Sequence, residues 1–432
     1  MRFVFVFVLV VACGGGPRLA VSSALDRRDV GGAITAYEHV RDSDGDDDAL
    51  LRRIAELMLE QEGASDETDR RDAALRQLAL AGTAGRSALE RLGQNGSVHA
   101  LAVLAEHGSG SAREALRIHI DSEDPDVRAA AVLGLSVDSD RDLLLSLAAE
   151  PSARVRAAAV ARLAELAPES VARGVLEERA RIDPDPSVRG AAVRALGSFD
   201  TAAISLIRER LSDPIASVRM TAVAALLHAD RDGGRAVLAS LFEAPPSAQG
   251  IEAARLLGTR LERDQPPTDA DASAARAYLL SALSANDAGL RSQAAVALST
   301  LRGPAEIETA LAHALASEPD AGAKLAVARA LLPLAHGENA ALEAIRALSA
   351  GEVTMTSLQA SIVLAARHES VGVERVEAAM HGADIPLRRV AARALARDAM
   401  LPTHVEPALS DSDALVRIQA AGGILAAAAA SE

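Results

Sequence analysis

The sequence has little of what usually fills a thick globular core. Aromatic residues make up 2 % of its 432 positions, Trp is absent, and beyond residue 12 the only aromatic side chains are Tyr37, Phe199, Phe242 and Tyr278. Compact domains bury much of their area in aromatic rings, so one thick core is not expected. No stretch keeps the apolar–polar alternation of a strand between turn signals. The abundant Ala and Leu favour helices packed in thin layers.

Cysteine and lysine occur once each, at Cys13 and Lys324. A single Cys excludes an internal disulfide framework. The single Lys follows Ala323, which excludes the Gly-Lys-Ser/Thr sequence of a P-loop. The formal net charge is −15, and phosphate backbones repel so acidic a chain. We therefore expect no nucleic-acid partner.

Catalytic and metal-binding patterns are missing as well. No Gly-x-Ser-x-Gly nucleophile elbow occurs. No two of the ten His residues stand within four positions of each other, which excludes a helical H-x-x-x-H zinc motif. We expect no enzyme, no catalytic residue, no cofactor and no metal site.

The N-terminus carries a short apolar run between Arg2 and Cys13. Its ten residues are too few to span a bilayer. The run ends in Val10-Val11-Ala12-Cys13, which resembles the signal of bacterial lipoproteins. That resemblance implies that residues 1–12 are a signal peptide and that Cys13 is lipidated after cleavage. A plain signal peptide and a mis-set start codon stay open as alternatives, and the second would leave the protein in the cytoplasm.

Residues 13–25 are expected to form a flexible tether, because Gly14-Gly15-Gly16-Pro17 cannot be helical. The lipoprotein resemblance implies a cell-envelope location facing the periplasm, with the outer membrane favoured because Gly14 follows the Cys. The membrane would then be contacted through the N-terminal lipid only.

Residues 26–62 differ from the chain that follows and predict two helices, at 29–40 and 49–61. Ala33, Ile34 and Tyr37 lie on one side of the first helix. The pair resembles one tetratricopeptide unit. It is also what a capping hairpin at the end of a helical repeat array requires, and both interpretations stay open.

A repeat with a period near 31 residues begins near residue 69, in the range that indicates a solenoid. Its clearest copies are VRAAAVLGL, VRAAAVARL, VRGAAVRAL and VRMTAVAAL, and the residue after each Val serves as the reference. The twelve references are Arg71, His99, Arg128, Arg156, Arg189, Arg219, Gly250, Arg291, Lys324, Ser357, Arg388 and Arg417.

Two further columns support this frame. Ala stands three residues after the reference in every repeat except at Val327, and Leu or Ile stands seven after it except at Glu106. Positions −1, +3 and +7 are four apart, so they form one apolar stripe on a helix. Asp or Asn recurs four residues before the reference, where it can cap the helix; these residues are Asn95, Asp124, Asp185, Asp287, Asp320, Asp384 and Asp413.

The pattern resembles HEAT repeats of the short bacterial type found in phycobilin lyase subunits. The matching residues are Asp-Pro-Asp-Val-Arg at 124–128, Asp-Pro-Asp-Pro-Ser-Val-Arg at 183–189, and the Ala and Leu columns. The resemblance implies an all-α, right-handed α-solenoid of about 12 helical hairpins over residues 63–432. In that family, the Asp and Arg residues commonly bond between neighbouring repeats. We favour this structural role for the Arg column over a basic binding ladder.

A long repeat without a catalytic motif favours a non-catalytic scaffold, anchored to a membrane, that binds a protein or peptide along the solenoid. The alternative is a lyase- or chaperone-like subunit, by resemblance to the phycobilin lyase proteins.

Gly250 and Ser357 replace the Arg in two repeats, and an acidic insertion at 262–272 follows the first of them. The insertion could be a binding loop or a hinge, and a tolerated surface insertion stays open as the alternative. With the tether at Cys13 and the first helix pair, the Gly250 repeat and its insertion are the candidates for function.

Overall fold

The computed structural model describes residues 16–136, 139–166, 170–198, 203–229, 231–264, 270–301, 305–334, 336–397 and 407–429. Cys13 and the predicted signal peptide lie outside these ranges. Within them the chain is all helical and contains no strand. It divides into two compact units. Unit 1 comprises Met1–Leu104 and Glu374–Glu432, and unit 2 comprises Ala105–Val373.

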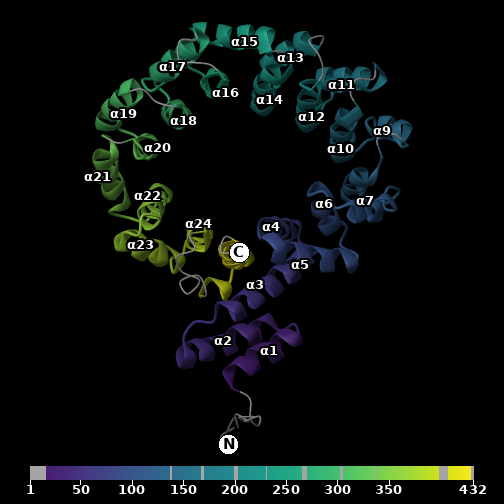
Figure 1. Cartoon of the computed structure of the whole chain (residues 1–432), viewed down its shortest axis with the longest axis vertical. Coiled ribbons are helices and arrows are strands. Elements are labelled where there is room, and N and C mark those ends of the chain that lie inside the picture. Colours follow the sequence, from purple (N-terminus) through teal and green to yellow (C-terminus); the bar gives the residue numbers. More distant parts are fainter. Residues whose placement is uncertain are drawn as a thin grey trace, which may run out of the picture. The chain divides into compact units, whose positions relative to one another are not determined.

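All twelve reference positions lie in helices, here called second helices because each follows a first helix of its hairpin (Figure 1). They are α4 (Thr68–Leu80), α6 (Val98–Glu106), α8 (Pro125–Ala131), α10 (Ala153–Leu163), α12 (Pro186–Leu196), α14 (Ala216–Ala229), α16 (Ala248–Asp264), α18 (Ala288–Ser299), α20 (Ala321–Leu331), α22 (Met355–Ala365), α24 (Ile385–Arg397) and α26 (Ala414–Ala429).

The first helices with described bounds alternate with them along the chain. They are α3 (Asp48–Gly63), α5 (Gly82–Gln94), α7 (Gly110–Arg117), α9 (Arg141–Leu147), α11 (Ser170–Ile182), α13 (Ile204–Glu209), α15 (Arg231–Ala239), α17 (Ala270–Ala282), α19 (Ala305–Ser317), α21 (Glu338–Ser349) and α23 (Ser370–Met380). The expected α-solenoid of helical hairpins is thereby confirmed.

The Ala and Leu columns form the core as the spacing predicts. Eleven of the twelve residues at +3 are 0 % exposed, from Ala74 to Ala420, and eleven of the twelve at +7 are at most 8 % exposed. The small Ala lets a neighbouring helix approach closely, and Leu fills the space beside it. Each Leu buried in this way contributes about 1.5–3 kcal/mol.

The repeat with reference His99 is the exception, because its frame is displaced by two residues. Ala100 and Leu104 are buried in α6, whereas Glu106 is exposed. The Ser97 hydroxyl accepts a hydrogen bond from the backbone N–H of Ala100. The predicted N-cap Asn95 instead follows the C-terminal end of α5. Ala100 and Leu104 take the places of the +3 and +7 residues, so the apolar stripe of this repeat stands two residues earlier than the spacing predicts, and Glu106 falls outside it.

The other predicted Asp caps accept backbone N–H groups of the first turn, as expected from their position. Asp287 accepts from Leu290 and Asp320 from Ala323, at 2.9 and 2.8 Å. Asp124, Asp185, Asp384 and Asp413 do the same in their own helices.

In unit 2 the helices form two layers (Figure 1). Second helices from α8 to α22 pack against one another in sequence order and make the inner layer, and first helices from α7 to α21 lie outside them. The acidic insertion begins and ends in this unit as helix, since α16 continues to Asp264 and α17 begins at Ala270. Residues 265–269 of the insertion lie outside the described ranges.

Unit 1 contains both ends of the repeat array. The last second helix, α26, packs against α24 on one side and against α3 and α4 on the other (Figure 1). Its residues Ile424 and Leu425 are 3 % and 2 % exposed. The helix therefore stacks on the first repeat as a neighbouring repeat would, although about 340 residues separate Gln77 from Gln419, whose side chains lie 3.3 Å apart.

The N-terminal division differs from the expected one. Residues 17–25 do not belong to a tether but form α1 (Pro17–Asp26), with Pro17 in its first turn. Val21 and Ala24 are buried there, and α1 packs mainly against α2 (Val30–Asp44). Pro is compatible with the first helical position, and the buried side chains hold the helix in place. The predicted partner of α2 is α3, but α3 is the first helix of the first HEAT-type hairpin.

Candidate ligand groove

The Arg column forms a regular ladder between neighbouring second helices. Arg189 donates from Nη1 to the carbonyl oxygens of Asp183 and Pro184, six and five residues before it, at 2.9 and 3.2 Å. Its Nε and Nη2 donate to Asp213 of the next repeat at 2.9 and 2.8 Å. Such planar bidentate pairs fix geometry as well as charge.

Each carboxylate of the ladder also organises its own turn. Asp213 accepts the backbone N–H of Ile215 at 3.0 Å, two residues further along the chain. The same arrangement recurs at Arg128–Glu150, Arg156–Asp183, Arg291–Glu318 and Arg388–Asp411. The acidic residue stands six positions before the next reference. This column is a sequence signal that our frame left out, because Asp and Glu alternate in it.

The central Arg–carboxylate pairs of the ladder are buried and ionised. Arg189 is 8 % and Asp213 3 % exposed. The hydrogen bonds from Arg189 lower the pKa of Asp213, against the opposing effect of burial. Arg291 likewise lowers the pKa of Glu318. The structural role expected for the Arg column is confirmed at these rungs.

Gly250 replaces the Arg because Tyr278 occupies its place. The Tyr278 hydroxyl donates to the Pro245 carbonyl at 3.2 Å and accepts the Ser247 N–H at 3.0 Å. Any Cβ at position 250 would overlap that hydroxyl group. The Tyr ring comes from α17 in the next repeat and also packs on Phe242, with centroids 5.2 Å apart. The missing Arg thus has a structural explanation.

Ser357 replaces the Arg in a similar way. Its hydroxyl donates to the Glu352 carbonyl at 2.8 Å, which is the carbonyl five residues before the reference. Thr354 and Ser357 also cap α22 reciprocally. Neither departure in the Arg column is therefore free for a ligand.

Space for a ligand lies on the inner layer of unit 2. Two adjoining hollows, of about 520 and 420 Å³, run across α14, α16, α18, α20 and α22. They meet at Val296, which lines both and is 55 % exposed. We call these two hollows together the inner groove. Its walls mix apolar side chains such as Met220, Ile251 and Leu325 with Gln and Arg side chains.

Three Arg side chains line the inner groove, and they differ in their partners. Arg255 is held by both carboxylate oxygens of Glu252, at 2.7 and 2.6 Å. Arg219 donates only from Nη1, to the carbonyls of Asp213 and Pro214. Its Nε and Nη2 have no partner among the described residues, because the next turn carries Ala244 where other rungs carry a carboxylate. Arg329 is exposed and is paired with no described residue.

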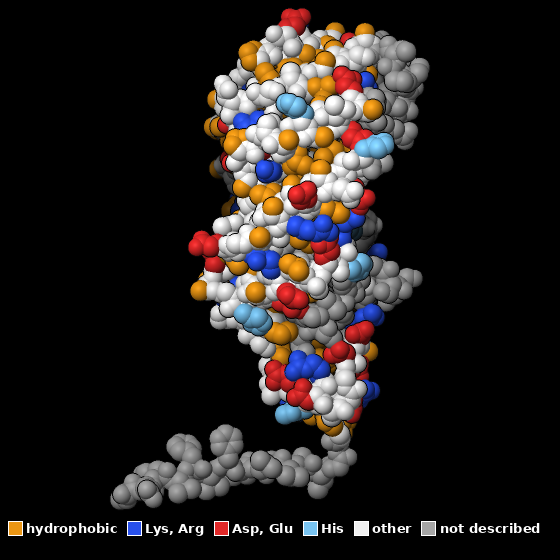
Figure 2. Space-filling model, turned by 90° about the vertical axis from the view of Figure 1, so that its left-hand side faces the viewer, with side chains coloured by type: hydrophobic (Ala, Val, Ile, Leu, Met, Phe, Trp, Pro, Cys, Tyr) orange, Lys and Arg blue, Asp and Glu red, His pale blue; other side chains and the backbone are white. Residues whose placement is uncertain are grey.

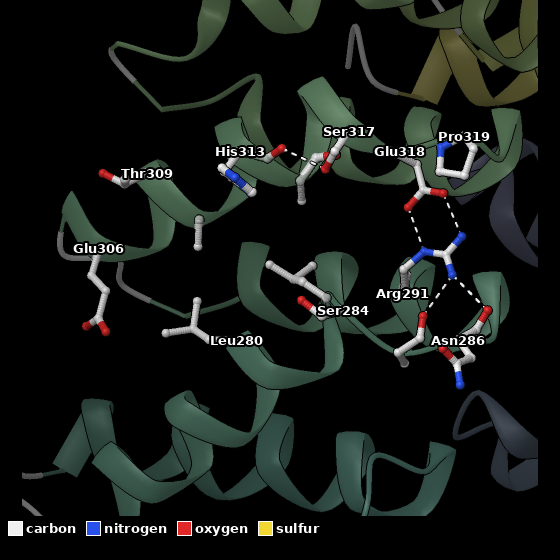
Figure 3. A pocket seen from close by; sticks show the side chains of 14 residues that line it. Leu280, Ser284, Asn286, Arg291, Glu306, Thr309, His313, Ser317, Glu318 and Pro319 are labelled. Carbon is white, nitrogen blue, oxygen red and sulfur yellow. Dashed lines mark hydrogen bonds and ion pairs between the residues drawn. The ribbon is translucent and has the colours of Figure 1, made fainter.

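A further hollow, of about 790 Å³, lies on the outer layer between α17 and α19 (Figure 3). Its most prominent charges are already used, since Arg291 bonds to Glu318 and to the carbonyls of Ala285 and Asn286. His313 and Thr309 line it from α19. The space-filling view in Figure 2 shows acidic, basic and apolar side chains interspersed on the face that it presents, without a broad field of one sign.

The described ranges hold neither a cluster of metal-ligand side chains nor a membrane-spanning helix. Among these residues, no three His, Cys, Asp or Glu side chains gather in a way that could hold a metal ion. No helix in the same ranges is both long and apolar enough to cross a membrane.

These features define an α-solenoid of HEAT-type hairpins. Residues 141–227 and 173–257 match the sequence model of HEAT repeats, and the same columns continue on both sides of them. No curated protein matches the sequence.

Several solved structures are similar at low identity. The myosin chaperone UNC-45 from C. elegans, solved with an Hsp90 peptide, is 14 % identical with a TM-score of 0.40, covering 93 % of this chain and 57 % of that one. The CpcE–CpcF complex of phycocyanin lyase from Nostoc is 16 % identical with a TM-score of 0.27, covering 68 % and 94 %. No partner or activity is transferred from them.

Proposed function

We propose that this chain is a membrane-anchored, non-catalytic scaffold that binds a protein or peptide partner in the inner groove of unit 2. The observation that carries the proposal is the groove, whose lining comes from five second helices and includes the exposed Gln293, Val296 and Gln359. Small-molecule sites enclose most of their ligand, whereas an elongated groove suits an extended chain. Mixed apolar and polar walls are typical of protein interfaces.

The anchor in this proposal is a lipid on Cys13. It rests on the lipoprotein-like sequence Val10-Val11-Ala12-Cys13. Two or more acyl chains hold a protein stably at a membrane where one does not. The proposed location is the cell envelope, facing the periplasm, with the outer membrane favoured.

The groove is tested by changing the one residue shared by its two halves. Full-length Cys13→Ala protein serves as bait in an envelope extract, with and without Val296→Glu. We expect a reproducible partner that Val296→Glu loses, because a buried carboxylate at the centre would be unpaired. Val371→Glu is the matched control, since Val371 is also 55 % exposed but lies on α23 outside the groove. A partner lost equally from both variants, or no partner at all, would contradict the proposal.

The anchor has its own test. Cells grown with radioactive palmitate should label the wild-type chain and leave Cys13→Ala unlabelled. The wild-type protein should also sediment with membranes. Equal labelling of the two proteins would remove the anchor from the proposal without affecting the groove.

A further inference from the structure

The inner groove is basic in a chain that is acidic as a whole. Its lining holds Arg219, Arg255 and Arg329 but only one acidic residue, Glu252. The formal charge of the groove is therefore 3 − 1 = +2, against −15 for the chain. The helices α14, α18, α20 and α22 contain no Asp or Glu at all. Charges further away than about 10 Å are largely screened at ordinary ionic strength.

Two of these positive charges are available to a ligand, one toward each end of the groove. Arg219 on α14 keeps Nε and Nη2 unpaired, and Arg329 on α20 has no partner among the described residues. The pair Arg255–Glu252 between them is internally neutral. Guanidinium groups with free donors bind carboxylates in a bidentate manner, so the two ends of the groove are suited to carboxylates.

Amide and apolar side chains line the groove beside these two charges. Gln293 on α18 lies between them, and Gln359 on α22 lies one helix beyond Arg329. Gln293 and Gln359 stand two residues after their references, are exposed, and have no hydrogen-bond partner among the described residues. A Gln amide can donate and accept at once, which matches the alternating N–H and C=O groups of an extended peptide. Val296 offers an apolar contact beside them. A phosphate backbone would instead require positive charge along the whole groove.

The spacing of the helices sets the length of the ligand. Packed helices lie about 9 Å apart, and three such steps lead from α14 through α16 and α18 to α20. An extended peptide advances about 3.4 Å per residue. Side chains that reach Arg219 and Arg329 are therefore about eight residues apart.

We propose that the inner groove binds an extended polypeptide segment with two acidic side chains about eight residues apart. One carboxylate pairs with Arg219 and the other with Arg329, while Gln293 bonds to the peptide backbone between them and Gln359 to the backbone beyond Arg329. This inference rests on the proposed scaffold function and adds the chemistry of its partner.

A random library of twelve-residue peptides displayed on phage, panned against full-length Cys13→Ala protein, tests the proposal. We expect enrichment of sequences with Asp or Glu at two positions about eight apart. Synthetic peptides from this set should bind at least tenfold more weakly to Arg329→Gln, because each charge-assisted hydrogen bond is lost. Exchange of either acidic residue for Gln should have the same effect. Arg194→Gln is the matched control, since Arg194 is an exposed Arg on α12 outside the groove.

Four results would overturn the acidic-peptide proposal. The first is enrichment of peptides without acidic pairs, and the second is an equal loss in Arg194→Gln. The third is Arg329-dependent binding to phosphatidylglycerol vesicles instead of peptides, and the fourth is that no peptide is enriched. Val296→Glu distinguishes a failure of the acidic-peptide proposal from a failure of the scaffold proposal. If non-acidic peptides are enriched and Val296→Glu releases them, the groove still binds a partner and only the acidic chemistry is wrong. If no peptide is enriched, the acidic-peptide proposal is rejected, and the pull-down alone decides on the scaffold.

Discussion

At the scale of single residues, burial decides which ion pairs matter. Arg189 and Asp213 are almost fully enclosed, and every donor and acceptor between them is paired. Arg346 and Glu369 form an equally short bidentate pair at 2.9 and 2.8 Å, but their side chains are 55 % and 27 % exposed. Exposed pairs contribute about 0–1 kcal/mol. Removing one partner from a buried pair costs about 3–5 kcal/mol, since the other charge is left without compensation.

Asp213→Asn should therefore lower the free energy of unfolding by about 3–5 kcal/mol at neutral pH, measured by urea unfolding with circular dichroism. The loss should depend on pH. Arg189 lowers the pKa of Asp213 in the folded chain below the ordinary value of 3.8. The stabilisation by this carboxylate is then complete above pH 3.8 and lost as the pH falls through the folded pKa. Wild type and variant should converge in acid.

Glu369→Gln is the control for this experiment, because Arg346 also lowers the pKa of Glu369 but the pair is exposed. We expect it to change stability by about 0–1 kcal/mol. Equal losses from Asp213→Asn and Glu369→Gln would show that the ladder does not depend on burial.

At the scale of helices, the period of the sequence predicted nearly everything that is local. The apolar stripe, the Asp caps and the alternation of first and second helices all depend on residues within a few turns, so one sequence suffices to place them. Two features could not be found in this way. The displacement of the apolar stripe in α6 by two residues is hidden because Ala is common at many positions. The Tyr278 replacement requires a side chain from the following hairpin to reach back over about 30 residues.

The replacement of the missing Arg by the Tyr278 side chain gives a prediction for Gly250. Gly250→Ala should destabilise the chain by about 1–3 kcal/mol, because the new methyl group meets the Tyr278 ring and overpacking carries that cost. In a Tyr278→Leu background, the same change should cost much less. Urea unfolding of the four proteins measures the coupling as a double-mutant cycle.

Gly174→Ala provides the reference for helix propensity in that cycle. Gly174 lies on α11, and a Cβ there has no neighbour within 4 Å. This change should stabilise the chain by up to about 1 kcal/mol. Additive effects of Gly250→Ala and Tyr278→Leu would contradict the account of the missing Arg.

At the scale of the whole molecule, the two ends of the repeat array belong to one unit. The ladder continues across this junction, since Arg417 of the last repeat pairs with Glu62 of α3 at 3.2 Å. Glu62 also pairs with Arg70 at 2.7 Å. No local sequence pattern predicts a contact between residues 355 positions apart. A capping hairpin is one of the two interpretations left open for residues 26–62, and in the structure α26 packs against α3 and α4 at the start of the array.

The inner groove could not be predicted from the sequence either, although each of its residues occupies a regular repeat position. Gln293 and Gln359 stand at +2, as Gln419 does in the last repeat, and Arg255 and Arg329 stand at +5, as Arg76, Arg194 and Arg393 do in other repeats. The period predicts that these positions share a helix face. Which face neighbouring helices leave open is decided only by their stacking. The missing carboxylate opposite Arg219 is visible in the sequence as Ala244, but only once the structure has shown that the acidic column pairs with the Arg column.

The junction of the two ends offers the last prediction. Gly422 of α26 lies against Gln77 of α4, so that a Cβ at position 422 would overlap the Gln77 side chain. Gly422→Leu should therefore separate α26 from α4 and lower the local opening free energy of α4 by about 1–3 kcal/mol. Hydrogen exchange followed by mass spectrometry should show faster exchange over Thr68–Leu80 and unchanged exchange over α12 in unit 2. Adding Gln77→Ala makes room for the larger side chain and should restore slow exchange in α4. If Gly422→Leu leaves α4 as protected as in the wild type, the two ends are held together by other contacts than this close approach. If Gln77→Ala fails to restore protection, the exchange reports damage within α26 itself and not the separation of the first and last repeats.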